Sequence, residues 1–251
     1  MKKLIWKNVW QLLAALAFLL LVWAIAYFAV GNELLVPSLP DSLAAVGELL
    51  VGGAFWRALG MSLLRALFAF FLAFLFAMIF AIIAYLSPSF SNFFAPIVSA
   101  MRSLPVLAVL LILLAFLGAG QAPVAVAFLS LFPMLYTGIL TALSGIDGEL
   151  IAVSRVHGAR LWARITRLYV PLASPYVLRE AGGALSYSLK LIVSAEVLSQ
   201  TARSLGGMMQ EARVYAEMPT LFALVTVTFL VGLLLELGVS ALAIAVEKRV
   251  K

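Results

Sequence analysis

Residues that most often carry out enzyme chemistry are scarce in this sequence. It contains one histidine, His157, and no cysteine, so neither a histidine cluster nor a thiolate metal site is available. Hydrolysis would need a nucleophile with a base, or a set of metal ligands, and no carboxylate pair has a suitable spacing. No phosphate-binding G-x-x-x-x-G-K-[ST] loop is present either. We therefore expect no enzyme activity, no metal and no bound cofactor in this chain.

The polar segment with the most unusual pattern runs from Asp147 to Pro171. Apolar residues alternate with arginines in it, and Gly158 interrupts it near the middle, which is typical of a pair of amphipathic helices. We expect the segment to dock on another protein, with apolar anchors in a groove and basic residues around them. A surface helix lying on anionic lipid is the alternative. The alternating residues are Ile151, Val156, Ala159, Ile165 and Leu168, with Arg155, Arg160, Arg164 and Arg167.

The composition indicates which solvent surrounds the rest of the chain. Hydrophobic residues make up 65% of the 251 positions and charged residues only 11%, against about 45–50% and about 25% in soluble domains. Too few charges remain to cover a soluble surface, which excludes a soluble enzyme, a disordered chain and a nucleic-acid-binding protein. The sequence therefore predicts an all-α integral membrane protein.

Apolar runs long enough to cross the hydrocarbon indicate a single transmembrane domain over residues 1–251. Residues 103–146 carry no charge over 44 positions, enough for two helices joined by a tight turn between Gly118 and Pro123. The first run has 22 residues, longer than the apolar part of a signal peptide, so we expect an uncleaved span. The six predicted spans are 9–30, 62–86, 97–117, 122–143, 170–195 and 220–246, with a polar loop over 147–169.

The basic residues predict the orientation in the membrane. Ten of the 17 Lys and Arg residues lie at the two ends of the chain and in the loop between spans four and five, and six spans put these three regions on one side. Cytoplasmic loops carry the excess of Lys and Arg. Both termini are therefore expected in the cytoplasm.

Ionisable residues inside the spans are costly, and they usually face protein or water. Arg179, Glu180 and Glu236 lie at comparable depths, and we expect them to form a polar cluster that is either a structural lock or a gate. Arg65 is expected to anchor span two at the membrane interface.

A second group of polar residues lies toward the other end of span five. Lys190 has Ser186 and Ser194 four residues away on the same helix face, and Glu196 follows. This face is the predicted solute pathway, and a lysine there would suit an anionic solute. Alternatively, Lys190 extends to the interface, or it pairs with Glu196 or with another helix.

Two parts of the loop, 153–159 and 168–171, resemble the "EAA loop" of permease subunits in bacterial ABC importers. That pattern reads Glu-Ala-Ala, three residues, Gly, nine residues, Ile-x-Leu-Pro, and Gly158 and Pro171 lie at the required spacing. Ala152 stands where the family has Glu and Ser154 where it has the second Ala, while Glu149 lies one turn earlier. The resemblance assigns ATPase coupling to Glu149, Ala152, Ser154, Arg155, His157, Gly158, Ala159, Arg160 and Pro171.

The resemblance also implies an assembly. It implies a type I importer permease fold with a cytoplasmic coupling helix over 149–167, in the inner membrane of a bacterium. Two permease copies, expected as a homodimer, would work with two cytoplasmic ATPase subunits that bind ATP and Mg²⁺, and with an extracytoplasmic binding protein. The similar permeases are of the nitrate, sulfonate, taurine and thiamine-precursor type. A stand-alone secondary carrier or channel is the alternative, although such proteins usually show inverted repeats.

Overall fold

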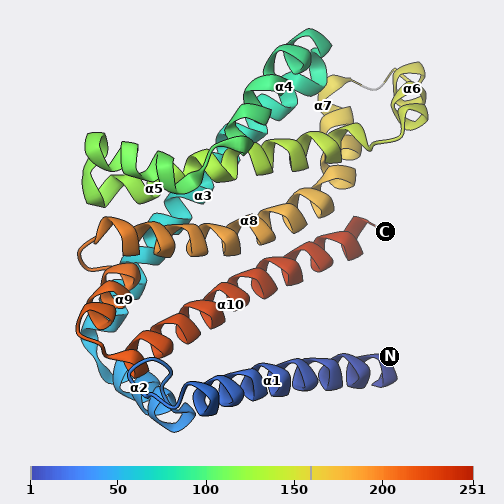
Figure 1. Cartoon of the computed structure of the whole chain (residues 1–251). Helices are drawn as coiled ribbons and strands as arrows, with labels where there is room; N and C mark the ends of the chain where they lie inside the picture. Colours follow the sequence, from blue (N-terminus) through green and yellow to red (C-terminus); the bar gives the residue numbers. More distant parts are fainter. Residues whose placement is uncertain (1, 159, 251) are drawn as a thin grey trace.

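The computed structural model describes residues 2–158 and 160–250, with the side chains in these ranges except those of 2–13, 15, 16, 155, 161 and 246–250. The described chain contains helices and no strand, which confirms the all-helical architecture expected from the sequence. In chain order (Figure 1), the helices are α1 (Lys2–Val30), α2 (Leu39–Val51), α3 (Gly53–Leu86), α4 (Pro88–Ser103), α5 (Val106–Ser144), α6 (Gly148–Val156), α7 (Leu161–Arg164), α8 (Val170–Ser199), α9 (Leu205–Val214) and α10 (Met218–Val250).

Among the described residues, four helical stretches are long and apolar enough to cross a membrane. They are Gly53–Leu86, Val106–Ser144, Trp162–Ser199 and Met218–Ala245, and a shorter apolar stretch covers Ala17–Val30. In Figure 1, α6 and both chain termini lie at one end of the bundle, while α2 and α9 lie at the other. The two ends of the molecule are therefore formed by different helices.

The long helix α5 folds back on itself at Gly118. This residue has φ 72° and ψ 172°, a conformation that almost only glycine adopts. Leu110 before the break and Val126 after it belong to one buried cluster, so the two arms lie side by side. The helix resumes at once, because Pro123 lies in its first turns, where a missing N–H is tolerated.

The single span expected over 97–117 is divided in the structure. Helix α4 ends at Ser103, and α5 begins at Val106. The break follows from Pro105, because proline disfavours helical geometry in the residue before it, and Leu104 accordingly has φ −66° and ψ 128°. The arm from Val106 to Gly118 is too short to cross about 30 Å of hydrocarbon at about 1.5 Å per residue.

Helix α8 lies at the centre of the packing, where it contacts α3, α5, α9 and α10. Small residues allow this close approach of helices in a membrane. On α3 a stripe of alanines is buried at intervals of three or four residues, and it forms part of the main core. These residues are Ala66, Ala69, Ala73, Ala77, Ala81 and Ala84.

Candidate functional site

Helix α6 protrudes from the bundle (Figure 1), and several of its apolar side chains are exposed. Leu150 is 46% exposed, Val153 54% and Val156 85%, and Trp162, just beyond the helix, is 75% exposed. Exposed apolar residues on a projecting helix are typical of a surface that another protein covers. The surface formed by Leu150, Val153, Val156 and Trp162 is called the α6 surface below.

Both ends of α6 are fixed by local interactions. Asp147 Oδ1 accepts a hydrogen bond from the Glu149 backbone N–H at 2.8 Å, which caps the start of the helix. At its end, His157 Nδ1 lies 3.0 Å from the Val153 carbonyl oxygen. Gly158 then has φ 68°, a left-handed conformation that ends helices and that favours glycine. The glycine of the family pattern therefore serves as the stop of this helix.

The other residues assigned to coupling lie on α6, just after it, or at the start of α8. Glu149, Ala152, His157 and Arg160 are exposed, and Pro171 is half-buried at the start of α8. The half-buried Ser154 donates a hydrogen bond to the Ile151 carbonyl oxygen at 2.7 Å. Ala159 and the side chain of Arg155 lie outside the described part of the chain.

The helix expected over 149–167 is shorter in the structure. It ends at Val156, and residues from Leu161 onward continue into α8 through one wide turn, Ile165–Tyr169, in which Val170 N–H bonds the Ile165 carbonyl oxygen. Pro171 causes the wide turn, because its nitrogen cannot donate a hydrogen bond to the carbonyl oxygen four residues earlier and its ring crowds that oxygen. Residues 161–169 of the predicted loop are therefore the first part of the helix that continues as α8.

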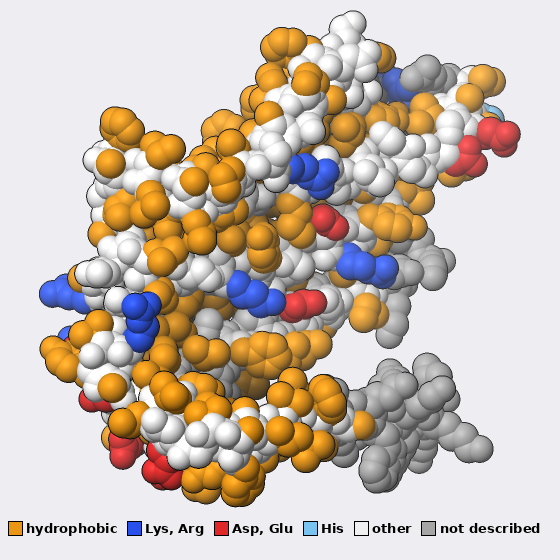
Figure 2. All heavy atoms as spheres, viewed as in Figure 1, with side chains coloured by type: hydrophobic (Ala, Val, Ile, Leu, Met, Phe, Trp, Pro, Cys, Tyr) orange, Lys and Arg blue, Asp and Glu red, His pale blue; other side chains and the backbone are white. Residues whose placement is uncertain are grey.

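The residues predicted for a solute pathway differ in their exposure. Lys190 and Ser194 are exposed on α8, while Ser186 is buried. A methyl group on Gly232 of α10 would lie 3.5 Å from Ser186 Oγ and 3.9 Å from Lys190 Cε, so both side chains lie beside α10. Figure 2 shows basic and acidic side chains gathered over α8 and α10 on this face.

Glu196 lies apart from Lys190, in a buried site near the end of α8. Its carboxylate accepts hydrogen bonds from Arg65 Nη1 at 2.9 Å, Ser62 Oγ at 2.7 Å and Gly206 N–H at 3.3 Å. The Arg65 side chain is 14% exposed and that of Glu196 is fully buried. The expectation that Arg65 anchors at the interface is therefore wrong, and so is the alternative pairing of Lys190 with Glu196.

The ion pair and the hydrogen bonds around it join three helices at the end of the bundle far from α6. Ser62 and Arg65 belong to α3 and Glu196 to α8, and the Ser62 hydroxyl also accepts a hydrogen bond from Leu205 N–H at the start of α9, at 2.9 Å. A methyl group on Gly206 would lie 2.4 Å from Glu196 Cβ, so only glycine lets α9 approach this closely. The tie among these residues is called the Glu196 network below.

Arg179 and Glu180 line a cavity of about 870 Å³ with Arg102, Thr137 and Tyr176. Arg102 Nη2 donates a hydrogen bond to Thr137 Oγ1 at 3.1 Å. Glu180 fits against α5 because a methyl group on Gly138 would lie 2.5 Å from Glu180 Cγ. Glu236 is exposed on α10 and is not among the residues that line this cavity.

Several residues that meet in these sites belong to no recognisable sequence motif. Arg65 and Glu196 are separated by 131 positions, and neither Gly138 nor Thr137 belongs to a recognisable motif. An acidic residue near the end of one span and a basic residue near the end of another are the signal that would have suggested the ion pair. The rotation of each helix about its axis brings such residues together. A sequence that is apolar on all sides of the helix does not reveal that rotation.

Sequence comparison identifies the family. Residues 73–251 match the family described as binding-protein-dependent transport system inner membrane component. The taurine transport system permease protein TauC of Escherichia coli (strain K12) is 27% identical over 92% of this chain and 86% of its own length. SsuC of Bacillus subtilis (strain 168), whose name gives it as an aliphatic sulfonates transport permease, is 24% identical over 88% and 80%.

Solved structures share the fold. A bacterial alginate ABC transporter, in complex with an alginate pentasaccharide-bound periplasmic protein, has a chain that matches with a TM-score of 0.69, 15% identity and coverage of 96% of both chains. The MetNI methionine ABC transporter in inward-facing conformations matches with a TM-score of 0.60, 20% identity and coverage of 79% and 96%. The chain belongs to the family of inner-membrane permease components of binding-protein-dependent ABC importers.

Proposed function

We propose that this permease forms the path for a small solute in an ATP-driven importer, and that the α6 surface is its contact with the ATPase. The partner ATPase binds ATP and Mg²⁺, and an extracytoplasmic binding protein delivers the solute. Family membership supports this assignment, as does the periplasmic protein present in the alginate transporter complex. The single observation that carries the role of α6 is its exposed row of apolar residues on a helix that projects from the bundle.

The proposed orientation places α6 and both termini in the cytoplasm. Arg160, Arg164 and Arg167 follow α6 closely in the sequence, and the two chain ends, whose sequences are rich in lysine, lie at the same end of the bundle as α6 (Figure 1). This distribution follows the positive-inside rule. The multi-pass chain then presents α2 and α9 on the opposite, extracytoplasmic side.

The proposed solute path runs along the exposed face of α8 on which Tyr187, Lys190 and Ser194 lie. Lysine within a span is costly next to lipid, so this face requires water or protein against it. A second copy of the chain, forming a homodimer, would supply that cover and enclose the path. Lys190 favours an anionic solute, which agrees with a cargo of the sulfonate, taurine or nitrate type, although thiamine precursors also remain candidates.

The test of the α6 assignment is Val153→Glu in the transporter expressed with its ATPase subunit. A carboxylate placed in an apolar contact should reduce ATPase association by about tenfold or more, equivalent to about 1.4 kcal/mol or more. The melting temperature should stay unchanged, because Val153 is 54% exposed. Co-purification of the ATPase and its activity are measured.

Leu34→Glu is the matched control, since Leu34 is 64% exposed in the loop after α1, at the other end of the bundle. It should leave ATPase association unchanged. If Val153→Glu retained the ATPase at wild-type amounts, α6 would not be the contact. Transport by the permease without any ATPase would favour the stand-alone carrier instead.

A further inference from the structure

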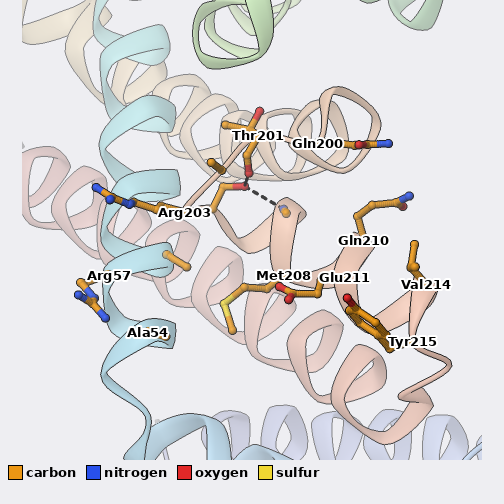
Figure 3. A pocket seen from close by; sticks show the side chains of 14 residues that line it. Ala54, Arg57, Gln200, Thr201, Arg203, Met208, Gln210, Glu211, Val214 and Tyr215 are labelled. Atoms are coloured by element: carbon orange, nitrogen blue, oxygen red, sulfur yellow. Dashed lines mark hydrogen bonds between the residues drawn. The ribbon is translucent and has the colours of Figure 1, made fainter.

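A cavity of about 770 Å³ opens beside α9 (Figure 3), at the end of the bundle opposite α6 (Figure 1). Its walls come from the start of α3, from the turn over 200–204 and from α9. It lies outside the solute path and outside the α6 surface. Nothing in the functions derived above uses it.

Two arginines give this cavity its chemical character. Figure 3 shows Arg57 and Arg203 on the α3 side, while Gln210 and Glu211 come from α9 and Tyr215 directly follows it. Both arginines are exposed, and within the described residues neither side chain has a hydrogen bond or an ion pair. Guanidinium groups bind carboxylates through two parallel hydrogen bonds, so these two side chains offer donors that no described residue uses.

The turn that carries Arg203 is strained and firmly held. Gln200 and Arg203 have φ of 51° and 52°, a left-handed conformation that costs roughly 1–2 kcal/mol for a residue with a side chain. Thr201 Oγ1 donates to the Ala119 carbonyl oxygen at 2.7 Å, and Ser204 Oγ accepts from Gly207 N–H at 2.8 Å. Strain of this kind persists where the surroundings enforce it, and it concentrates at sites of recognition.

The Glu196 network holds the opposite wall in place. It fixes the start of α9 to α3 through Ser62 and to α8 through Gly206. A methyl group on Gly207 would lie 2.3 Å from the Thr201 carbonyl oxygen, so α9 also contacts the turn closely. The cavity is therefore formed before any partner arrives, which lowers the entropic cost of binding.

We propose that this cavity receives a carboxylate side chain of the extracytoplasmic binding protein when that protein docks. The inference rests on the proposed function, which places α9 on the extracytoplasmic side and assigns delivery to a binding protein. Glu211 on the facing wall disfavours a multiply charged phosphate group more than a single carboxylate. Tyrosine and arginine are also enriched in protein interfaces, and both line the cavity.

The test uses the complete transporter with its ATPase, in phosphatidylcholine nanodiscs, and the binding protein of the same transporter. In the double variant Arg57→Glu, Arg203→Glu we expect the Kd for the binding protein to rise by about tenfold or more, because like charges then face each other. Its binding should also depend less on salt. Basal ATPase activity should stay unchanged, while stimulation by the binding protein should fall.

Arg213→Glu is the matched control, because Arg213 is exposed on α9 and does not line the cavity. It should change the Kd by less than about twofold. Equal effects of the double variant and this control would overturn the proposal. An effect seen only in nanodiscs with phosphatidylglycerol would also overturn it, since the cavity would then bind a lipid headgroup. Failure of the wild-type transporter to respond to the binding protein would instead contradict the proposed function.

Discussion

Glu196 is the only charged side chain that is buried among the described residues. A buried carboxylate is stable only where its desolvation is offset by hydrogen bonds and an opposite charge, and Arg65, Ser62 and Gly206 N–H supply these. Replacement of one member leaves the others without partners. The network should therefore respond strongly to a change as small as a carboxylate to an amide.

Glu196→Gln keeps the shape of the side chain and removes its charge, which leaves Arg65 without its partner. We expect a loss of about 3 kcal/mol of stability, in the range typical of a broken buried ion pair. A clear fall in the melting temperature of the purified protein, followed by intrinsic fluorescence, measures it. The exposed Glu217→Gln is the control, and equal melting temperatures for the two variants would contradict the structure at this site.

At the scale of elements, α5 shows how one residue directs a long apolar segment. The two arms pack together only because the chain reverses at Gly118, where φ is 72° and ψ is 172°. Gly120, two residues later, has no such conformation. Neither position has atoms within 4 Å of an added methyl group. The two glycines therefore differ in backbone conformation and not in the space around them.

Gly118→Ala should destabilise the hairpin by roughly 1–3 kcal/mol, because a side chain is strained in this region of φ and ψ. Gly120→Ala should be neutral or slightly stabilising, since alanine favours a helix over glycine. Melting temperatures and the yield of inserted protein check both variants. Equal losses from the two substitutions would contradict the special role of the backbone conformation at Gly118.

At the scale of the whole molecule, α8 connects the end of the bundle near α6 with the end near α9. It continues the helix that begins beside α6, and it ends near Glu196 under α9. The part of the α6 surface at Trp162 is therefore joined by one continuous helix to the end of the bundle where α9 lies. This arrangement requires that α6 and α9 lie on opposite sides of the membrane.

The natural absence of cysteine makes this topology directly measurable. A permease expressed without its ATPase would carry a single Ala152→Cys on α6 or a single Tyr215→Cys after α9, both at exposed positions. A membrane-impermeant maleimide should label Tyr215→Cys in intact cells. It should label Ala152→Cys only after the membrane is permeabilised. The reverse pattern would place both termini outside.

The sequence alone determined the class of protein and its family, because composition and the spacing of Gly158 and Pro171 do not depend on how helices pack. It also pointed to a turn between Gly118 and Pro123, since glycine and proline act on their own backbone. The division of the 97–117 run and the short length of α6 are local effects of proline and glycine. The length of an apolar run alone does not predict them.

Only the tertiary structure decided which residues meet. The pairing of Arg65 with Glu196, the burial of Ser186 against α10 and the fit of Glu180 against Gly138 depend on the rotation of each helix about its axis. In a soluble helix, the polar face reveals that rotation. Here the spans are apolar on nearly every side, because lipid and core are equally apolar, so the sequence carries no periodic signal for it.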